Sequence, residues 1–280
     1  MSNPGTFTYA NQTVNRLGYG AMRITGAGVW GYPDDVDECL AVLKRAVELG
    51  VNFVDTADSY GPNVSEELIA RALHPYGDVK IATKAGLLRT GPGVWVPCGR
   101  PDYLRQECEL SLRRLGQESL DLFQLHRVDP TVPAEDQFSL LRALLDEGKV
   151  RAVGLSNASV DQIIAAREIV AVSTVQNLYN ITNRTSEDVL DYCQEHDIGF
   201  IPWFPVASGD LAHAGGPLDA LASAQGITVA QLSLAWLLRR SPVMLPIPGT
   251  SKLAHVEENC ASASIEVSDA TFEQIDALAR

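Results

Sequence analysis

Along the whole chain, short apolar segments alternate with longer segments of helical periodicity, and this alternation restricts the fold more than any other feature. Eight segments have the length and the apolar or β-branched character of buried strands; they are residues 17–21, 51–56, 79–84, 120–126, 150–157, 174–179, 199–205 and 244–248. Several are apolar almost throughout, which is typical of parallel strands that helices cover on both faces. Eight such strands, each followed by a helix, predict an α/β fold of the closed (β/α)₈, or TIM, barrel type.

Several of the expected helices carry recognisable start and stop signals. Asp35, Asn63 and Ser159 each precede a helical segment and have Glu or Gln three residues later, which is the pattern of a capping box. Pro101 suits the first position of a helix Pro101–Leu115, because its missing N–H would have no partner there anyway, and Gly116 suits the residue that ends it. These signals place helices between the expected strands.

The two ends of the chain add one element each to this barrel. Residues 6–16 are interpreted as a β-hairpin that covers the bottom of the barrel, and Asp269–Leu278 as a last helix. A length of 280 residues, 46% of them hydrophobic, suits one α/β barrel with a large core. No linker rich in Pro, Gly or Ser divides the chain, so we expect a single domain over residues 1–280.

Charge and cysteine content argue against several classes of partner. A net charge of −13 without a long basic run would repel nucleic acid and an anionic membrane surface. No apolar run approaches the ~20 residues of a membrane helix, and residues 1–18 do not resemble a signal sequence. The five cysteines form no Cys-x-x-Cys pair, which indicates reduced thiols. We therefore expect a cytoplasmic protein that binds no nucleic acid, membrane or metal; the sequence does not specify its oligomeric state.

One motif points to a different fold. Residues 26–31 read Gly-Ala-Gly-Val-Trp-Gly and match the G-x-G-x-x-G motif of Rossmann domains, with Asp55 at the end of the next strand. However, Pro33, Asp34 and Asp35 separate the last glycine from the helix. Helix amides would then not open onto a pyrophosphate, and negative charge would stand in its place. A βα loop over the active site explains these residues better.

Side chains that can take part in catalysis follow three successive expected strands, where the active sites of such barrels lie. Asp55 and Tyr60 follow the second strand, Lys84 ends the third and His126 ends the fourth. A carbonyl that accepts a hydride needs a proton on its oxygen, but a free tyrosine with a pKa of about 10 is a poor acid near neutrality. A lysine ammonium held by Asp55 lowers that pKa, and a neutral His126 can donate a hydrogen bond to the same oxygen. We interpret Tyr60 as a general acid that Lys84 and Asp55 tune and His126 assists.

Taken singly, each of these residues also has a purely structural interpretation, such as a half-buried tyrosine or an ion pair between neighbouring strands. Taken together they form ordered motifs: residues 55–61 read Asp-Thr-Ala-Asp-Ser-Tyr-Gly, residues 83–84 read Thr-Lys, and the next strand finishes in His126. This pattern resembles the aldo-keto reductase family, and the resemblance extends over essentially the whole chain. It implies a barrel that reduces a small-molecule carbonyl with NADPH, in which Asp55, Tyr60, Lys84 and His126 are the catalytic residues.

The same resemblance implies that mainly the second half of the chain holds the cofactor. Polar side chains after the fifth and sixth strands would fix the carboxamide, Trp203 would stack on the nicotinamide ring, and the segment after the eighth strand would bind the phosphates and adenine. The implied cofactor residues are Gly20, Ala21, Met22, Asp55, Ser156, Asn157, Gln176, Trp203, Val206, Ser208, Leu211, Gly249, Thr250, Lys252, Glu258 and Asn259. Because the family often has a basic residue where this chain has Gly249 and His255, we expect NADPH with NADH as an alternative.

Two tryptophans in irregular segments, Trp30 and Trp95, are expected to line the substrate pocket, and aromatic walls suit an apolar or planar aldehyde. A narrower resemblance, to bacterial pyridoxal reductases, implies pyridoxal as a substrate. It rests on residues 14–22, 26–31, 58–62 and 247–251.

Two other functions stay open at this point. The barrel could bind a nicotinamide cofactor as a redox-sensing or regulatory protein with little turnover. It could also be a metal-dependent hydrolase, but the expected strand ends carry no cluster of His and Asp ligands. Steady-state turnover of a carbonyl separates the reductase from both.

Overall fold

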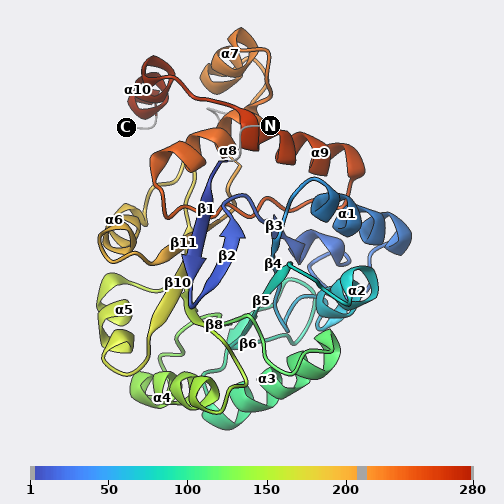
Figure 1. The fold of residues 1–280 in the computed structure, drawn as a ribbon, viewed down its shortest axis with the longest axis vertical. Coiled ribbons are helices and arrows are strands. Elements are labelled where there is room, and N and C mark those ends of the chain that lie inside the picture. The colour runs from blue at the N-terminus through green and yellow to red at the C-terminus, as the bar shows by residue number, and fades with distance from the viewer. Residues whose placement is uncertain (1–3, 207–212, 279–280) are drawn as a thin grey trace.

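A computed structural model of the chain describes residues 4–206 and 213–278. Its centre is a curled sheet of seven parallel strands in the order β11-β10-β9-β8-β5-β4-β3. These strands are β3 (Tyr19–Gly20), β4 (Phe53–Asp55), β5 (Lys80–Ala85), β8 (Leu122–Leu125), β9 (Val153–Ser156), β10 (Val172–Leu178) and β11 (Gly199–Trp203). Helices stand around the outside of the sheet (Figure 1), which explains why its strands are apolar on both faces.

Ten α-helices lie within the described residues: α1 (Val36–Glu48), α2 (Val64–Leu73), α3 (Pro101–Leu115), α4 (Ala134–Asp146), α5 (Val160–Arg167), α6 (Glu187–Glu195), α7 (Pro217–Ala224), α8 (Val229–Arg240), α9 (Leu253–Ala261) and α10 (Asp269–Leu278). The predicted caps of α1 and α5 are confirmed, because Asp35 and Ser159 each accept a bond from a backbone amide of the first turn. The predicted cap of α2 is wrong: Asn63 has a left-handed backbone with φ of 70° and makes no capping bond.

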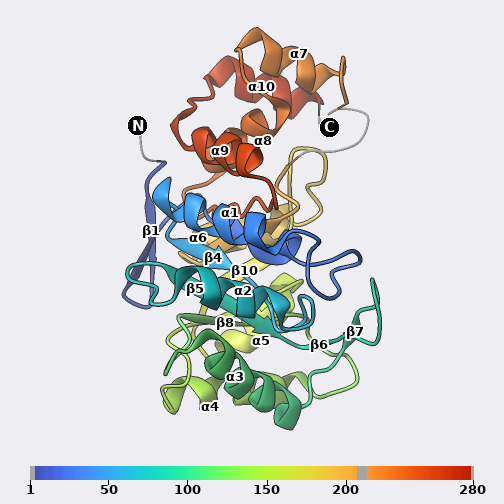
Figure 2. The same ribbon diagram turned by 90° about the vertical axis from the view of Figure 1, so that its right-hand side faces the viewer.

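The N-terminal hairpin covers one end of the sheet. Strand β1 (Thr6–Tyr9) pairs antiparallel with β2 (Gln12–Asn15), and the pair crosses the middle of the ring of helices in Figure 1. Tyr9 and Val14 belong to a small buried cluster; its other members are Phe53, Ala82, Leu122, Ala152, Ile201, Leu245 and Ile247. A second hairpin, β6 (Leu87–Leu88) with β7 (Val96–Pro97), lies toward the opposite end of the molecule (Figure 2).

The segment predicted as the eighth strand is extended but does not form a regular strand. The Phe200 amide donates to the Val243 carbonyl oxygen and the Leu245 amide donates to the Phe200 carbonyl oxygen, both at 2.8 Å. On its other side the segment accepts bonds from the Gly18 and Gly20 amides at 2.9 and 3.2 Å, through the carbonyl oxygens of Pro246 and Pro248. Because proline has no N–H to donate, the segment cannot complete a ladder. It nevertheless bonds to both edges of the seven-stranded sheet.

A helix that crosses a membrane has to be long and apolar. No single helix in residues 4–206 or 213–278 is long and apolar enough to cross one. Helices α7 and α8, which meet at 86°, pass that test only as a bent pair.

Candidate active site

The carboxyl ends of three neighbouring strands bring four side chains together. Asp55 is the last residue of β4, Lys84 lies near the end of β5, His126 follows β8, and Tyr60 lies between β4 and α2. The centroids of the Tyr60 and His126 rings are 5.8 Å apart, and the Lys84 ammonium nitrogen is 5.1 Å from the Tyr60 ring centroid. All four side chains are buried. The structure therefore places the four predicted catalytic residues in one cluster.

The cluster contains a buried ion pair between Lys84 and Asp55. Lys84 Nζ donates to Asp55 Oδ1 at 2.5 Å and to the Thr56 carbonyl oxygen at 2.7 Å. The other carboxylate oxygen, Asp55 Oδ2, accepts from Gln124 Nε2 at 3.0 Å and from Gln176 Nε2 at 2.9 Å. Both oxygens of the buried carboxylate thus have donors, which such a pair requires to be stable.

Gln124 was missed by the sequence reasoning, although a signal for it exists. It is a polar residue in the apolar strand β8, and it stands two positions before His126. Alternate residues of a strand share a face. The alternation could therefore have placed Gln124 on the side of the sheet that carries the site.

Two opposing effects set the pKa of the Tyr60 phenol. Burial raises the pKa of the Tyr60 phenol above its ordinary value, and the charges of Asp55 and Asp58 add to this effect. The Lys84 ammonium acts in the predicted direction and lowers the pKa, but it does not outweigh burial. The predicted effect of Lys84 is therefore present, but the net pKa lies above the ordinary value, because desolvation of the phenolate costs more than the lysine returns. The phenol therefore keeps its proton near neutrality.

His126 is uncharged in this environment. Burial lowers its pKa well below the usual value, and the positive charges of Lys84, Arg127 and Arg89 lower it further. Ser59 Oγ lies 3.3 Å from His126 Nδ1. When the Ser59 hydroxyl donates to Nδ1, the proton of the neutral ring lies on Nε2, which can then donate to a substrate oxygen.

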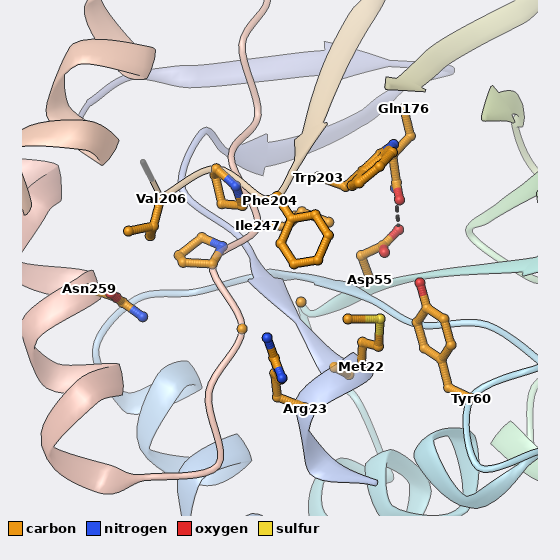
Figure 3. Close-up of a pocket in the computed structure, with 15 residues that line it drawn as sticks. Met22, Arg23, Asp55, Tyr60, Gln176, Trp203, Phe204, Val206, Ile247 and Asn259 are labelled. Atoms are coloured by element: carbon orange, nitrogen blue, oxygen red, sulfur yellow. Dashed lines mark hydrogen bonds between the residues drawn. The ribbon is translucent and has the colours of Figure 1, made fainter. Parts of the chain in front are cut away.

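A cleft extends from this cluster along the ends of β3, β10 and β11 (Figure 3). It is lined by Gly20, Ala21, Met22, Arg23, Asp55, Tyr60, Gln176, Trp203, Phe204, Pro205, Val206, Ile247, Pro248, Gly249 and Asn259. The predicted cofactor residues among these are Gly20, Ala21, Met22, Asp55, Gln176, Trp203, Val206, Gly249 and Asn259. Two further predicted residues, Ser208 and Leu211, lie outside the described part of the chain.

The remaining predicted cofactor residues do not line the cleft; they are Ser156, Asn157, Thr250, Lys252 and Glu258. Lys252 Nζ donates to Glu38 Oε2 at 2.5 Å, and Glu258 Oε1 accepts from the Thr228 hydroxyl at 2.5 Å. Asn157 Nδ2 donates to the Ser156 hydroxyl at 3.0 Å and to the His126 carbonyl oxygen at 3.2 Å. The charged groups of Lys252 and Glu258 therefore already have partners within the chain.

The chemistry of the cleft fits an elongated ligand with a planar ring and an anionic part. Within the described residues, the buried indole N–H of Trp203 has no hydrogen-bond partner. Phe204, which the sequence reasoning missed, also faces the cleft (Figure 3); its φ of 52° is left-handed, and Asn180 Nδ2 donates to its carbonyl oxygen at 2.8 Å. Arg23 also lines the cleft and is an exposed cation that forms no ion pair with a described residue.

The two predicted substrate residues lie at different depths. The Trp95 ring centroid is 6.2 Å from that of Tyr60 and 6.3 Å from that of His126, in edge-to-face arrangements. Trp30 lies farther out with its side chain 37% exposed, and its backbone bridges to Gly61. Trp95 is therefore the tryptophan that contacts the reactive cluster.

The glycine motif at residues 26–31 is part of an irregular loop beside Gly61 and is not the start of a helix, since α1 begins at Val36. The Rossmann alternative is thereby excluded. Among the described residues, no group of three or more His, Cys, Asp or Glu side chains has a geometry that could hold a metal ion.

Comparison with known proteins decides the family. Residues 16–280 match the aldo/keto reductase family. The chain belongs to the aldo/keto reductase family. An uncharacterized oxidoreductase of Schizosaccharomyces pombe is 53% identical over 98% of this aldo/keto reductase and 90% of its own length. The pyridoxine 4-dehydrogenase of Escherichia coli is 39% identical over 98% of both chains.

Solved structures agree with this assignment. An aldo-keto reductase from Klebsiella pneumoniae, crystallised in complex with NADPH, superimposes with a TM-score of 0.82 at 28% identity. The match covers 98% of this aldo/keto reductase and 94% of that chain. The family resemblance predicted from the strand-end motifs is confirmed, including the similarity to a pyridoxine 4-dehydrogenase.

Proposed function

We propose that this aldo/keto reductase reduces an aldehyde or ketone to the alcohol with a hydride from NADPH, and that Tyr60 protonates the carbonyl oxygen. The observation that carries the proposal is the buried, protonated phenol of Tyr60 beside the Lys84–Asp55 pair at the inner end of the cleft. The relative from Klebsiella pneumoniae that was crystallised with NADPH supports this choice of cofactor.

The cleft residues would hold the cofactor in a defined direction. Bound NADPH would supply the hydride for the carbonyl carbon. Gln176 donates to Asp55 and Trp203 is drawn beside it, so both suit the nicotinamide end; Asn259 lies on the side of the cleft away from Tyr60 and suits the adenine part, and the cation of Arg23 suits an anionic part. Because Lys252 is paired with Glu38, the chain is expected to accept NADH as well, with a modest preference for NADPH.

The catalytic residues then divide the proton chemistry among themselves. His126 Nε2–H donates a hydrogen bond to the carbonyl oxygen and orients it above the phenol. Tyr60 transfers its proton to that oxygen as the negative charge develops, and Lys84 stabilises the resulting phenolate until solvent returns a proton. Asp55 keeps the ammonium in place, and Gln124 and Gln176 hold Asp55. A general acid placed in this way contributes roughly 10²–10⁴ in rate.

Pyridoxal is the substrate that we propose first. The pyridoxine 4-dehydrogenase of Escherichia coli is 39% identical to this chain, and Trp95 provides a flat aromatic surface beside Tyr60 and His126 for a planar aldehyde. Loops that set substrate choice vary freely within a fold, so pyridoxal has to be compared with a generic aryl aldehyde.

The test is the loss of reduced-nicotinamide absorbance with pyridoxal or p-nitrobenzaldehyde, comparing the wild type with Tyr60→Phe. The matched control is Tyr192→Phe, because the Tyr192 hydroxyl bonds only to Arg167 among the described residues and lies on the outer helix α6. We expect Tyr60→Phe alone to abolish turnover while NADPH binding persists. Tight NADPH binding by the wild type without turnover of either aldehyde would favour the redox-sensing function, and no NADPH binding would contradict the proposal.

We also interpret the seven strands and residues 243–248 together as one (β/α)₈ barrel in a single domain of residues 1–280. The bonds that join that segment to Phe200, Gly18 and Gly20 support this interpretation. A single cooperative unfolding transition in calorimetry is the expected result, and two separated transitions would contradict it.

A further inference from the structure

One arginine joins three loops at the mouth of the site. Arg89 follows β6, and its guanidinium donates four bonds, all to backbone carbonyl oxygens. Nη1 donates to Val29 at 2.8 Å and to Ser59 at 2.7 Å, Nη2 donates to Gly28 at 2.8 Å, and Nε donates to Val94 at 2.8 Å. These acceptors belong to the loop after β3, the loop after β4 and the β6–β7 connection. A single side chain therefore fixes the relative positions of these loops.

The same guanidinium lies over the rings of both predicted substrate tryptophans and stacks closely on that of Trp95. Its central carbon lies 3.7 Å from the Trp95 ring centroid and 5.8 Å from the Trp30 ring centroid. Trp95 in turn makes edge-to-face contacts with Tyr60 and His126. Stacking with a cation over an aromatic face is favourable, so Arg89 holds Trp95 against the two catalytic rings.

Arg89 has no ion-pair partner among the described residues. Its donors are used on carbonyl oxygens instead, and its charge lies close enough to lower the pKa of His126. A lysine could keep the charge, but its single ammonium could not reach four carbonyl oxygens in one plane or stack on the indole. The four bonds and the stacking at position 89 therefore require the planar guanidinium of arginine.

The loops that Arg89 joins present an apolar rim to the solvent. Trp30, Leu88, Val94 and Val96 are each between 37% and 44% exposed, and all lie within residues 30–96 on the β3–α1 loop or the β6–β7 hairpin. Exposed apolar side chains that gather on neighbouring loops mark a binding surface. A rim of this kind favours a substrate with an apolar ring over a small polar one.

We propose that Arg89 is a positioning residue that sets substrate specificity. By fixing the three loops, it holds Trp95 and Trp30 as a wall beside Tyr60 and His126, and this wall selects carbonyls carried on a planar apolar ring over small aliphatic carbonyls. The inference rests on the proposed carbonyl reduction. The stacking and the four bonds can be tested separately from turnover.

The experiment compares Arg89→Met and Arg89→Lys with the wild type on p-nitrobenzaldehyde and on propanal, at saturating NADPH. We expect both variants to lose between about tenfold and a hundredfold in kcat/KM for the aryl aldehyde, mostly through KM, because the wall is displaced. The loss in kcat/KM for propanal should stay within about threefold, since Asp55, Tyr60, Lys84 and His126 are unchanged. Arg142→Met is the matched control and should behave as wild type, because Arg142 pairs with Asp146 on the exposed face of α4.

Three results would overturn the inference: equal losses on both aldehydes, no loss on the aryl aldehyde, or wild-type selectivity in Arg89→Lys. A second readout does not depend on turnover. Acrylamide should quench the tryptophan fluorescence of Arg89→Met more strongly than that of the wild type, and the excess should disappear when Trp95→Phe is added. If the wild type reduces neither aldehyde, the proposed function fails; unchanged quenching would independently reject the role of Arg89.

Discussion

Replacing Lys84 with methionine removes the ammonium that lies between Asp55 and Tyr60. In the folded chain, the Asp55 carboxylate would keep the amide donors of Gln124 and Gln176 but would lose its opposite charge. Lys84 is 0% exposed and Asp55 2% exposed, so water cannot replace the missing charge. Methionine fills a similar volume, and the change therefore isolates the loss of charge from the loss of packing.

The expected magnitude follows from burial. Breaking a fully buried ion pair on one side costs about 3–5 kcal/mol in the free energy of unfolding. For a chain of this size, about 2 °C of melting temperature corresponds to 1 kcal/mol, so we expect a decrease of about 6–10 °C. Adding Asp55→Asn removes the uncompensated carboxylate and should restore at least about half of the lost stability.

Activity should respond differently from stability. Both Lys84→Met and the double variant lack the cation that stabilises the Tyr60 phenolate, so kcat should fall by about 10²–10⁴ in each. The assays are thermal unfolding with circular dichroism and steady-state reduction of p-nitrobenzaldehyde. A Lys84→Met protein as stable as the wild type, or a double variant no more stable than Lys84→Met, would refute the reasoning. Recovery of kcat in the double variant would refute the role of Lys84 on Tyr60.

Three further predictions concern other parts of the chain. The folded chain lowers the pKa of His126, so unfolding takes up a proton below about pH 6.5. The melting temperature should therefore fall as the pH drops below about 6.5, and it should fall less steeply in His126→Asn. Glu38→Gln releases Lys252 from its ion pair and should lower KM for NADPH by about two- to fivefold without changing KM for NADH. Equal changes in KM for both cofactors would count against binding of the additional NADPH phosphate by Lys252. Ser159→Ala removes the cap of α5 and should lower the unfolding free energy by about 1 kcal/mol, with kcat/KM unchanged; a loss of activity would show that α5 is coupled to the site.

Local sequence signals determined much of the fold and of the candidate catalytic cluster. The alternation of apolar segments and helical segments indicated parallel strands with helices between them, because strands buried on both faces have no polar side. Asp55, Lys84 and His126 stand at or next to the ends of neighbouring strands. Parallel strands end at one edge of the sheet, so position along the chain was enough to bring these residues together. Caps such as Ser159 depend on bonds within one turn and were equally visible.

Other features depended on distances that no local pattern encodes. The predicted eighth strand contains Pro246 and Pro248, which lack the N–H that a ladder needs, and the structure shows that segment bonded to both sheet edges without a complete ladder. Lys252 was predicted to bind a phosphate from its place after the eighth strand, whereas its contact with Glu38, 214 positions earlier in the chain, is visible only in the structure. The carbonyl oxygens that Arg89 binds come together only after three loops have folded.

The electrostatics of Tyr60 show the same division. The sequence supplied the residues, and the direction of the Lys84 effect followed from charge alone. The net direction depended on how completely the phenol is removed from water, and burial is a property of the packed molecule. Residue types and strand order therefore determined which groups meet, whereas the tertiary structure decided their solvation, their partners and hence their protonation, because these depend on the whole three-dimensional surroundings.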